Sequence, residues 1–500
     1  MKKIILPSIT LLLCILIAAG FSSGNKHTRL LERKANDPIN CIASSPVLVP
    51  ISDAEFKARY NPNVVLVRKN VYSLSAAEIT SIKAGVTAMK ALPYTNNTSW
   101  LYQAAIHGTT LPDNLPSWNS CHKSGAAFFF LAWHRMYVYF FERILRAKSG
   151  DPNLTLPYWD YQTNAVMPPD WRNSDAANPL YDATRSATIN AGGSLPASIM
   201  VAFNNALALV PYYDFQTSLN GPHGSVHTTI NGNMYSTSTA AKDPVFWLHH
   251  CNIDRLWEVW LRECGGRASP TDAPWLSKTY TFFDENGVAV NMSGSQVLNT
   301  ASQLNYRYDF PFRLPCNIKI INKWVFQKAY LIRKVAPLSL DGRIQKANFS
   351  NEKPDELETF IKKTNKTKIN FSDPTAPEKL IISLGGIKVE KMPEGVVEVY
   401  LNLKQGEEPN PNSKNFVGLL DLFSAEHHQK MQGMMDMGDT EDTELDASKA
   451  AQALGLTLAD LKNAEISLVV RGNSLKGQEV KTTAKVTIQR TNFSIHTLNR

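Results

Sequence analysis

Residues 243–257 read DPVFWLHHCNIDRLW, and this stretch decides the fold of the chain. An aspartate followed by a proline is a typical helix start, because the carboxylate caps free backbone N–H groups and proline fits the first turn. The sequence therefore predicts a helix over 243–263, ended by the glycine pair at 265–266. His249 and His250 fall in its first turns among large apolar residues. Burying imidazoles there without a partner is costly, so the pair indicates a bound ligand.

Helical patterns surround this stretch in the chain. Ser75 and Glu78 form a capping-box pattern that predicts a helix over 75–92. A second helix is expected over 100–107 and a long aromatic one over 128–148, with proline-rich loops between them. We therefore expect a mainly α domain, a four-helix bundle with loop-rich surroundings. Bundles of this kind commonly build metal sites from side chains that face one another.

Seven of the eleven histidines lie between residues 107 and 250, in two clusters. The first cluster is His107, His122 and His134, and the second is His223, His227, His249 and His250. The spacing of His223 and His227 puts both side chains on one face of a helical turn, with Pro222 at the first helical position. Neutral imidazole is the commonest protein ligand of transition metals. Two groups of three imidazoles indicate two ions of copper, zinc or iron rather than magnesium or calcium.

Two of these stretches together resemble a known family. Residues 130–142 and 243–254 are similar to the copper A and copper B signatures of the tyrosinase, catechol oxidase and molluscan-type haemocyanin superfamily, and the likeness covers about residues 40–320. It implies two copper ions that together bind O2. The implied copper A ligands are His107, His122 and His134, and the implied copper B ligands are His223, His227 and His250. His249 would then be a neighbour that does not bind metal.

Some positions depart from the family pattern or carry predictions of their own. His122 precedes Phe130 by eight positions, where the family has five or six, so the alternative is an incomplete copper A site. Asp254, one turn after His250, is expected to orient that ligand or a neighbouring group. Arg135 and Glu142 are interpreted as a structural ion pair.

The resemblance also implies an activity, the oxidation of a small phenolic substrate by O2, from o-diphenols to o-quinones. Many family members assist phenol deprotonation with a glutamate just before the first copper B histidine and an asparagine just after it. Here those positions fall in 219–222 and at Gly224, which favours o-diphenols over monophenols, although Asn220 or Asp214 would be possible substitutes. Thr237 occupies the position of a bulky gate over copper, and its small side chain predicts an open pocket.

The sequence changes character after about residue 275. A hairpin is expected around the turn at 284–287, and the lysine-, asparagine- and proline-rich range 337–378 is predicted to be an exposed linker. Residues 379–500 contain short β-branched runs and predict a β-sandwich-like C-terminal domain. By resemblance it is similar to the shielding domain of latent polyphenol oxidases. We expect it to insert a side chain into the pocket.

The N-terminus has the pattern of a cleaved signal peptide, with two lysines before a short apolar stretch, over residues 1–24. The dicopper catalytic domain is then expected over 25–336, in a secreted or periplasmic protein without a stable membrane span after cleavage. The net charge of +8 is modest and the lysines are scattered, so nucleic acid is not an expected partner. The sequence does not indicate an oligomeric state.

A third group of soft ligands lies near the end of the chain. It consists of His427, His428, Met431, Met434, Met435 and Met437. Thioethers and imidazoles suit copper(I), which favours a copper-loading loop, and the alternative is an oxidation-prone surface loop.

Two further functions remain open from the residues. A haemocyanin-type oxygen carrier would have the same copper site with a blocked pocket, usually in many repeated units. A zinc hydrolase would need a general base and usually a carboxylate ligand, and no carboxylate has the required spacing.

Overall fold

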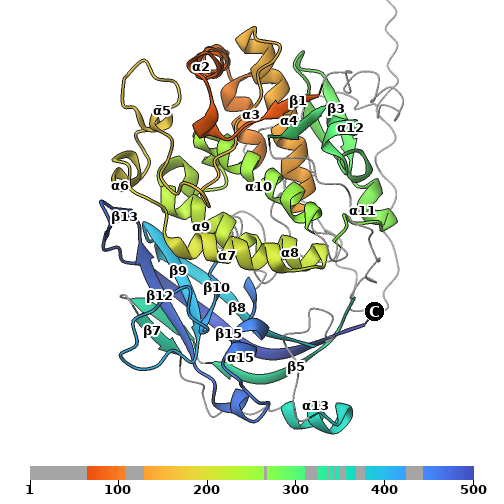
Figure 1. Cartoon of the computed structure of the whole chain (residues 1–500), viewed down its shortest axis with the longest axis vertical. Helices are drawn as coiled ribbons and strands as arrows, with labels where there is room; N and C mark the ends of the chain where they lie inside the picture. Colours follow the sequence, from red (N-terminus) through yellow and green to blue (C-terminus); the bar gives the residue numbers. More distant parts are fainter. Residues whose placement is uncertain are drawn as a thin grey trace, which may run out of the picture. The chain divides into compact units, whose positions relative to one another are not determined.

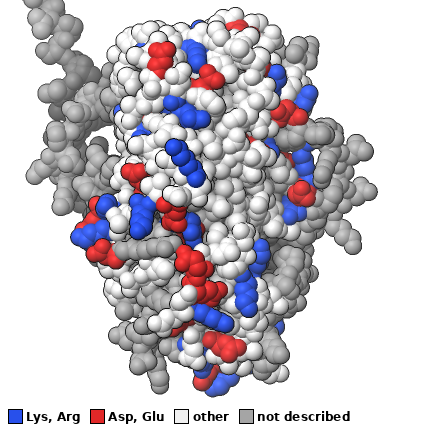
Figure 2. Space-filling view, turned by 60° about the vertical axis from the view of Figure 1, so that its left-hand side comes forward, with Lys and Arg blue, Asp and Glu red and all other residues white. Residues whose placement is uncertain are grey.

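The computed structural model describes residues 65–108, 129–263, 267–309, 325–335, 337–341, 344–347, 356–366, 378–423 and 443–499. The predicted signal peptide, His122 and the histidine–methionine loop at 427–437 lie outside these residues. Within them, no helix combines the length and the apolar character that crossing a membrane requires. Acidic and basic side chains are interspersed on the face drawn in Figure 2.

Most of the predicted helices are confirmed, with small shifts at their ends. Helix α2 (Ala76–Lys90) starts with the complete capping box of Ser75 and Glu78. Helix α4 (Phe130–Ser149) ends at Gly150, whose φ of 75° is the left-handed conformation that glycine adopts most easily. The other long helices are α3 (Trp100–Gly108), α7 (Ala197–Ala208), α9 (Asn220–Ile230) and α10 (Val245–Arg262). Helix α9 starts two residues before Pro222, so the prediction that Pro222 holds the first helical position is wrong.

Shorter elements complete the helical region. They are α5 (Pro169–Arg172), α6 (Ala187–Asn190), α8 (Tyr212–Ser218), α11 (Ala273–Ser277), α12 (Thr300–Leu304) and the 3-10 turns η1 (Val71–Ser73), η3 (Gly232–Tyr235), η4 (Ala240–Lys242) and η5 (Gly294–Gln296). The predicted hairpin is present as β2 (Thr279–Phe283) and β3 (Ala289–Ser293). Helices α2 and α10 pack on α4, whereas α3 packs mainly against η4. The mainly helical architecture is therefore confirmed, and a regular four-helix bundle is not.

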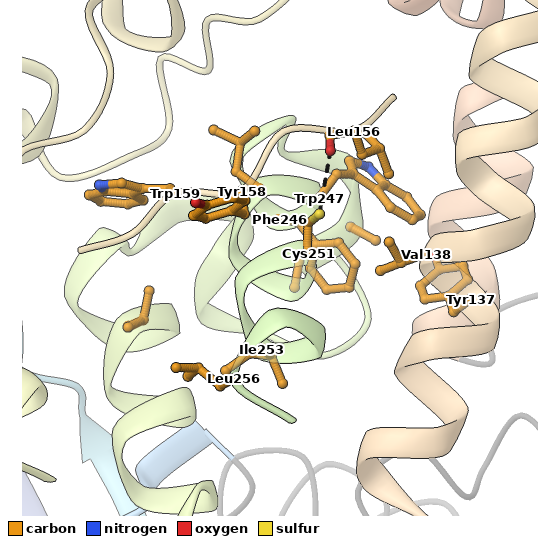
Figure 3. Packing of buried hydrophobic residues seen from close by; sticks show 14 of the residues in the cluster. Tyr137, Val138, Leu156, Tyr158, Trp159, Phe246, Trp247, Cys251, Ile253 and Leu256 are labelled. Carbon is orange, nitrogen blue, oxygen red and sulfur yellow. Dashed lines mark hydrogen bonds between the residues drawn. The ribbon is translucent and has the colours of Figure 1, made fainter. Parts of the chain in front are cut away.

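Aromatic side chains fill the core between α4 and α10. The rings of Phe141 and Trp247 are stacked, with centres 3.3 Å apart and planes 7° apart. On the neighbouring turn of α10, the buried Cys251 thiol donates to the carbonyl of Leu156 at 3.5 Å, as Figure 3 shows. This packing fixes α10 against the loop after α4, so both helices present their histidines from a rigid frame.

A buried ion network crosses the same two helices. It corrects the predicted Arg135–Glu142 pair and decides between the two roles expected of Asp254. Arg135 pairs with Asp254 and not with Glu142, which pairs instead with Arg68 at 2.8 Å. Asp254 also accepts hydrogen bonds from two tyrosine hydroxyls, Tyr306 at 2.5 Å and Tyr308 at 2.6 Å. No histidine is among the hydrogen-bond donors seen at Asp254 in the described part of the chain. The carboxylate therefore joins α4, α10, β1 (Leu66–Arg68) and β4 (Tyr306–Tyr308), and does not orient His250.

The C-terminal region consists mainly of two sheets with a common apolar core. One sheet has the strand order β10-β9-β12-β7, and the other has the order β11-β8-β15-β5 with β6 on β15. The long strands β5, β8 and β15 run side by side in Figure 1. The strands of the two sheets are β5 (Val325–Val335), β6 (Leu338–Asp341), β7 (Ile344–Ala347), β8 (Glu378–Lys391), β9 (Gly395–Leu401), β10 (Phe416–Leu419), β11 (Thr443–Asp446), β12 (Ile466–Gly472) and β15 (Lys485–Asn499). A small hairpin consists of β13 (Ser474–Leu475) and β14 (Gln478–Glu479). The helical elements of this region are α13 (Leu357–Thr364), α15 (Ser448–Ala453) and η6 (Asp460–Asn463).

The predicted linker over 337–378 is wrong where the structure describes it. Strand β6 pairs with β15, and β7 pairs with β12. Leu357 and Phe360 of α13 are buried in the core of this region. Although this segment is rich in lysine and asparagine, its apolar residues supply one strand to each sheet and a helix to the core of the C-terminal region.

Candidate metal centre

Four helices bring six imidazoles together in the helical core. His107 lies at the end of α3, His134 in the second turn of α4, His223 and His227 on α9, and His249 and His250 on α10. Each of them is at most 1% exposed. Phe130 and Phe246 supply apolar walls, with ring centres 4.7 Å from His223 and 4.2 Å from His250, respectively. The site is therefore dry and rich in nitrogen donors.

The ring nitrogens form two overlapping groups. His223, His227, His249 and His250 make up one, and His107, His134 and His250 make up the other, with the ligand atoms of each group within 4.8 Å of one another. His250 belongs to both groups, and its ring is stacked on that of His134 with centres 4.2 Å apart. The structure thus brings together five of the six predicted ligands. The sixth, His122, lies outside the described residues.

Backbone carbonyls fix the orientation of three of these rings. The Nδ1–H group of His107 donates to the carbonyl of Thr237 at 2.8 Å, that of His134 to Phe130 at 2.8 Å, and that of His227 to Met234 at 3.0 Å. A proton held on Nδ1 leaves the Nε2 lone pair for a metal. The carbonyls therefore set the tautomer that a metal ligand needs.

The spacing of two nitrogens fits a metal ion between them. Nε2 of His227 lies 3.3 Å from Nε2 of His250. Two imidazoles bound to one tetrahedral ion, with metal–nitrogen bonds of about 2.0–2.1 Å, have their nitrogens about 3.3 Å apart. Nδ1 of His250 and Nε2 of His249 are buried, and no hydrogen-bond partner for either is found among the described residues. An all-nitrogen donor set of this kind suits copper or zinc.

Burial keeps these imidazoles neutral. It lowers the pKa of His134, His227 and His250 well below the ordinary value, and neighbouring histidines lower it further. Burial, together with His107, lowers the pKa of His249 to about 3. Neutral imidazole is the form that binds metals, so the cluster is ready to bind an ion at neutral pH.

The structure describes two further residues that the sequence analysis considered, Thr237 and Asp214. Thr237 is buried, and its backbone carbonyl orients His107. Asp214 lies on α8, where burial raises its pKa to about 6 and its charged neighbours are Lys379 and Asp446 of the C-terminal region. No described histidine is among the groups that shift the pKa of Asp214, so the structure does not support Asp214 as a substitute for the missing glutamate.

Sequence reasoning missed the residue that covers the cluster, Phe423. Its ring is stacked on His227 with centres 4.0 Å apart and planes 9° apart, and lies 5.9 Å from His223 and 6.4 Å from His107. It is fully buried and follows β10 of the C-terminal region. The only signal in the sequence was the expectation that the C-terminal domain inserts some side chain, because nothing local distinguishes Phe423 from other apolar residues.

Family models match most of the described chain. Residues 97–197 and 173–263 match the common central domain of tyrosinase, and 269–324 match the polyphenol oxidase middle domain. Residues 334–496 match a domain family of unknown function. This last match starts inside β5 and so agrees with the strands found in the predicted linker.

Several characterised proteins are similar to this chain over most of its length. A tyrosinase of Hahella sp. (strain CCB-MM4) is 29% identical over 417 residues, which are 72% of this chain and 85% of the relative. The chloroplastic polyphenol oxidase II of Ipomoea batatas is 26% identical over 462 residues, 80% of this chain and 74% of the relative.

Solved structures share the fold. A latent aurone synthase (polyphenol oxidase) has a TM-score of 0.57 at 18% identity and covers 91% of this chain and 92% of its own. Latent apple tyrosinase has a TM-score of 0.55 at 20% identity, covering 90% of this chain and 99% of its own. Tyrosinases and polyphenol oxidases are oxidoreductases that hold a pair of copper ions, and the two histidine groups are compatible with that pair. Residues 97–263 of the chain therefore match the central domain of tyrosinase and residues 269–324 the polyphenol oxidase middle domain, and over most of its length the chain is similar to tyrosinases and polyphenol oxidases.

Proposed function

We propose that this protein is a secreted or periplasmic dicopper oxidase that uses O2 to convert o-diphenols to o-quinones and stays latent while its C-terminal region covers the site. The observation that carries the proposal is the cluster of buried, neutral imidazoles from four helices. The names and folds of its relatives support it, because they are tyrosinases and polyphenol oxidases in bacteria and plants.

The proposed ligands divide between two ions. His107, His134 and His122 would hold copper A, and His223, His227 and His250 would hold copper B. When bound, the pair supplies O2 binding and accepts electrons from the phenol. The chain itself holds the rings in the required tautomer through the carbonyls of Thr237, Phe130 and Met234, and Phe130 and Phe246 exclude water.

The proposed preference for o-diphenols follows from what lies around His223. The neighbouring positions are Pro222 and Gly224, which have no side-chain group that can hold a water molecule or accept a phenol proton. An o-diphenol is easier to oxidise and needs less help with deprotonation than a monophenol. Thr237, the proposed gate, would leave room for the second hydroxyl group.

Latency is proposed to depend on Phe423, whose ring covers His227 where a phenol ring would have to lie. Hydrogen bonds hold the C-terminal region in this position. Ser194 and Ser474 exchange two backbone hydrogen bonds of 2.7 and 3.1 Å, and the Asn473 side chain donates to the carbonyl of Thr229 at 3.2 Å. The C-terminal region is therefore expected to stay bound after a single cut in the chain, and displacement is the activating event.

The histidine–methionine loop is proposed to load copper. His427 follows Phe423 by four positions in the sequence, so the soft ligands of the loop come directly after the residue that covers the site. Copper uptake by a variant with all four methionines, Met431, Met434, Met435 and Met437, replaced by alanine tests this role. Unchanged loading would contradict it.

The proposed activity is tested by oxygen consumption with catechol. Copper-loaded, zinc-loaded and metal-free forms of the Phe423→Ala variant, in which the proposed cover of the site is removed, are compared in an oxygen electrode. We expect catechol-dependent O2 uptake only with copper. Reversible O2 binding without consumption would favour an oxygen carrier, and hydrolytic activity of the zinc form alone would favour a hydrolase.

A further inference from the structure

Helix α9 has a second face beside the one that presents His223 and His227. Gly221 and Gly224 lie three residues apart on it, so they are neighbours on the helix surface. A Cβ atom on Gly221 would lie 2.6 Å from the carbonyl oxygen of Leu419, and one on Gly224 would lie 2.2 Å from a carboxylate oxygen of Asp421. Real Cβ atoms essentially never come closer than 3.0 Å to such atoms. At Gly221 the contact is with backbone, so no other residue would allow the end of β10 to approach α9 this closely.

The segment that lies on this face, residues 419–423, is held from its opposite side. Leu420 and Leu422 are buried in the core of the C-terminal region, whereas Leu419 and Phe423 are buried in the core of the helical region. Asp421 lies between the two leucines and is itself buried. Because its side chains alternate between two packed cores, the segment cannot shift along α9 without losing contacts in both.

We propose that Gly221 and Gly224 form the seat of an autoinhibitory segment, residues 419–423, and that this seat sets Phe423 against His227. The inference rests on the proposed function and adds a way to open the site without cutting the chain. A methyl group at Gly221 would meet the backbone of the segment and lift it. A methyl group at Gly224 would displace the Asp421 carboxylate and press on Phe423, whose own Cβ lies 3.2 Å from the position of a Cβ on Gly224.

Gly221 and Gly224 lower the stability of α9, and the close contact with residues 419–423 explains why glycine is present at both positions. Glycine in a helix interior is unfavourable relative to alanine, because it loses more conformational freedom on folding. An alanine at either position would favour α9 itself and disfavour only the contact with residues 419–423. A gain of activity on substitution would therefore not arise from a weakened helix.

The test compares Gly224→Ala and Gly221→Ala with wild-type protein and with Gly85→Ala. Gly85 is a matched control, because its Cβ would lie 2.8 Å from the carbonyl oxygen of Leu145 in a helix contact away from the seat. One readout is catechol turnover of the copper-loaded protein. The other is hydrogen exchange of the amides in 419–423 in the metal-free protein, which reports lifting of the segment independently of copper.

We expect the two seat variants to raise turnover by about tenfold, as overpacking a fitted contact commonly shifts an equilibrium by that factor, and to speed amide exchange in 419–423. Gly85→Ala should change neither. Adding Asp421→Ala to Gly224→Ala removes the carboxylate that the new methyl group meets, and should return exchange and turnover toward the values of Asp421→Ala alone.

Unchanged exchange and turnover in folded Gly221→Ala and Gly224→Ala protein would overturn the seat. So would an equal gain in Gly85→Ala, since that would mean that any loss of stability opens the site. If Phe423→Ala raises turnover while both seat variants stay latent, only the seat fails and the proposed function stands. If Phe423→Ala has no effect but exchange in the seat variants increases, the seat exists without the proposed role in latency.

Discussion

Phe423 lies flat on the imidazole of His227, with ring centres 4.0 Å apart and planes 9° apart. One residue comes from the sheet-rich C-terminal region and the other from a helix of the histidine cluster. The contact joins the proposed metal centre to the part of the chain that is proposed to control it. Access to the site and the position of the C-terminal region are therefore expected to change together.

The copper content of variants is expected to show which of the two adjacent histidines of α10 is a metal ligand. Nε2 of His250 lies 3.3 Å from Nε2 of His227, whereas Nδ1 of His249 is 3.5 Å from the hydroxyl of Tyr161. We expect His250→Gln to lose copper, and His249→Gln to retain two ions per chain. Metal analysis of protein reconstituted with copper measures both variants. If His249→Gln loses an ion and His250→Gln does not, then His249 is the copper ligand and His250 is the neighbour that does not bind metal.

The stability of the protein should depend on pH through Asp214. Its pKa is raised by burial from 3.8 to about 6, with a raising contribution from Asp446 and an opposing one from Lys379. The folded protein therefore binds more protons than the unfolded chain between these values, so this contribution to stability is complete below pH 3.8 and is lost as pH rises through 6.

The substitution Asp214→Asn removes the carboxyl group and with it the loss of folding stability as pH rises. The variant should have a higher Tm than wild type at neutral pH, by about 2 °C or more, and the difference should shrink in acid. Scanning calorimetry across this range measures it. Asp175→Asn, at an exposed site, is the matched control and should leave the pH profile of Tm unchanged. A Tm difference that grows in acid would contradict the prediction.

Asp254 is expected to contribute more to stability than most residues of the chain. It is the common partner of Arg135, Arg68, Tyr306 and Tyr308, all of them buried. Removing one partner from a buried ion pair costs about 3–5 kcal/mol, so Asp254→Asn should lower the free energy of unfolding by about that amount in urea titrations. Glu78→Gln in an exposed capping box should cost only about 1 kcal/mol or less. Similar losses of unfolding free energy in both variants would show that the buried network contributes no more to stability than an exposed helix cap.

Local patterns predicted the elements of the helical region well. The capping box of Ser75 and Glu78, the glycine after α4 and the Asp-Pro start of α10 act on the backbone nearby, and they give helix ends within a residue or two. The histidine spacing also predicted which rings meet. It did so because the two copper signatures fix several positions around each histidine.

Predictions that depend on partners far away in the sequence were less accurate. Arg135 and Glu142 were paired because they lie on one helix, yet each binds a residue of another element. The composition of 337–378 predicts a linker. The strands in this range are stabilised by β12 and β15, more than a hundred residues later, and local composition does not carry that information. Phe423 and its glycine seat escaped prediction for the same reason.

The ring of Phe423 is proposed to keep the dicopper site closed. Oxygen uptake with catechol by copper-loaded Phe423→Ala protein tests it most directly, with Phe416→Ala as a matched control that removes a buried phenylalanine of the same region. We expect O2 consumption about tenfold or more above wild type for Phe423→Ala and no gain for Phe416→Ala. Folded Phe423→Ala protein that holds two copper ions and consumes no more O2 than wild type would contradict it.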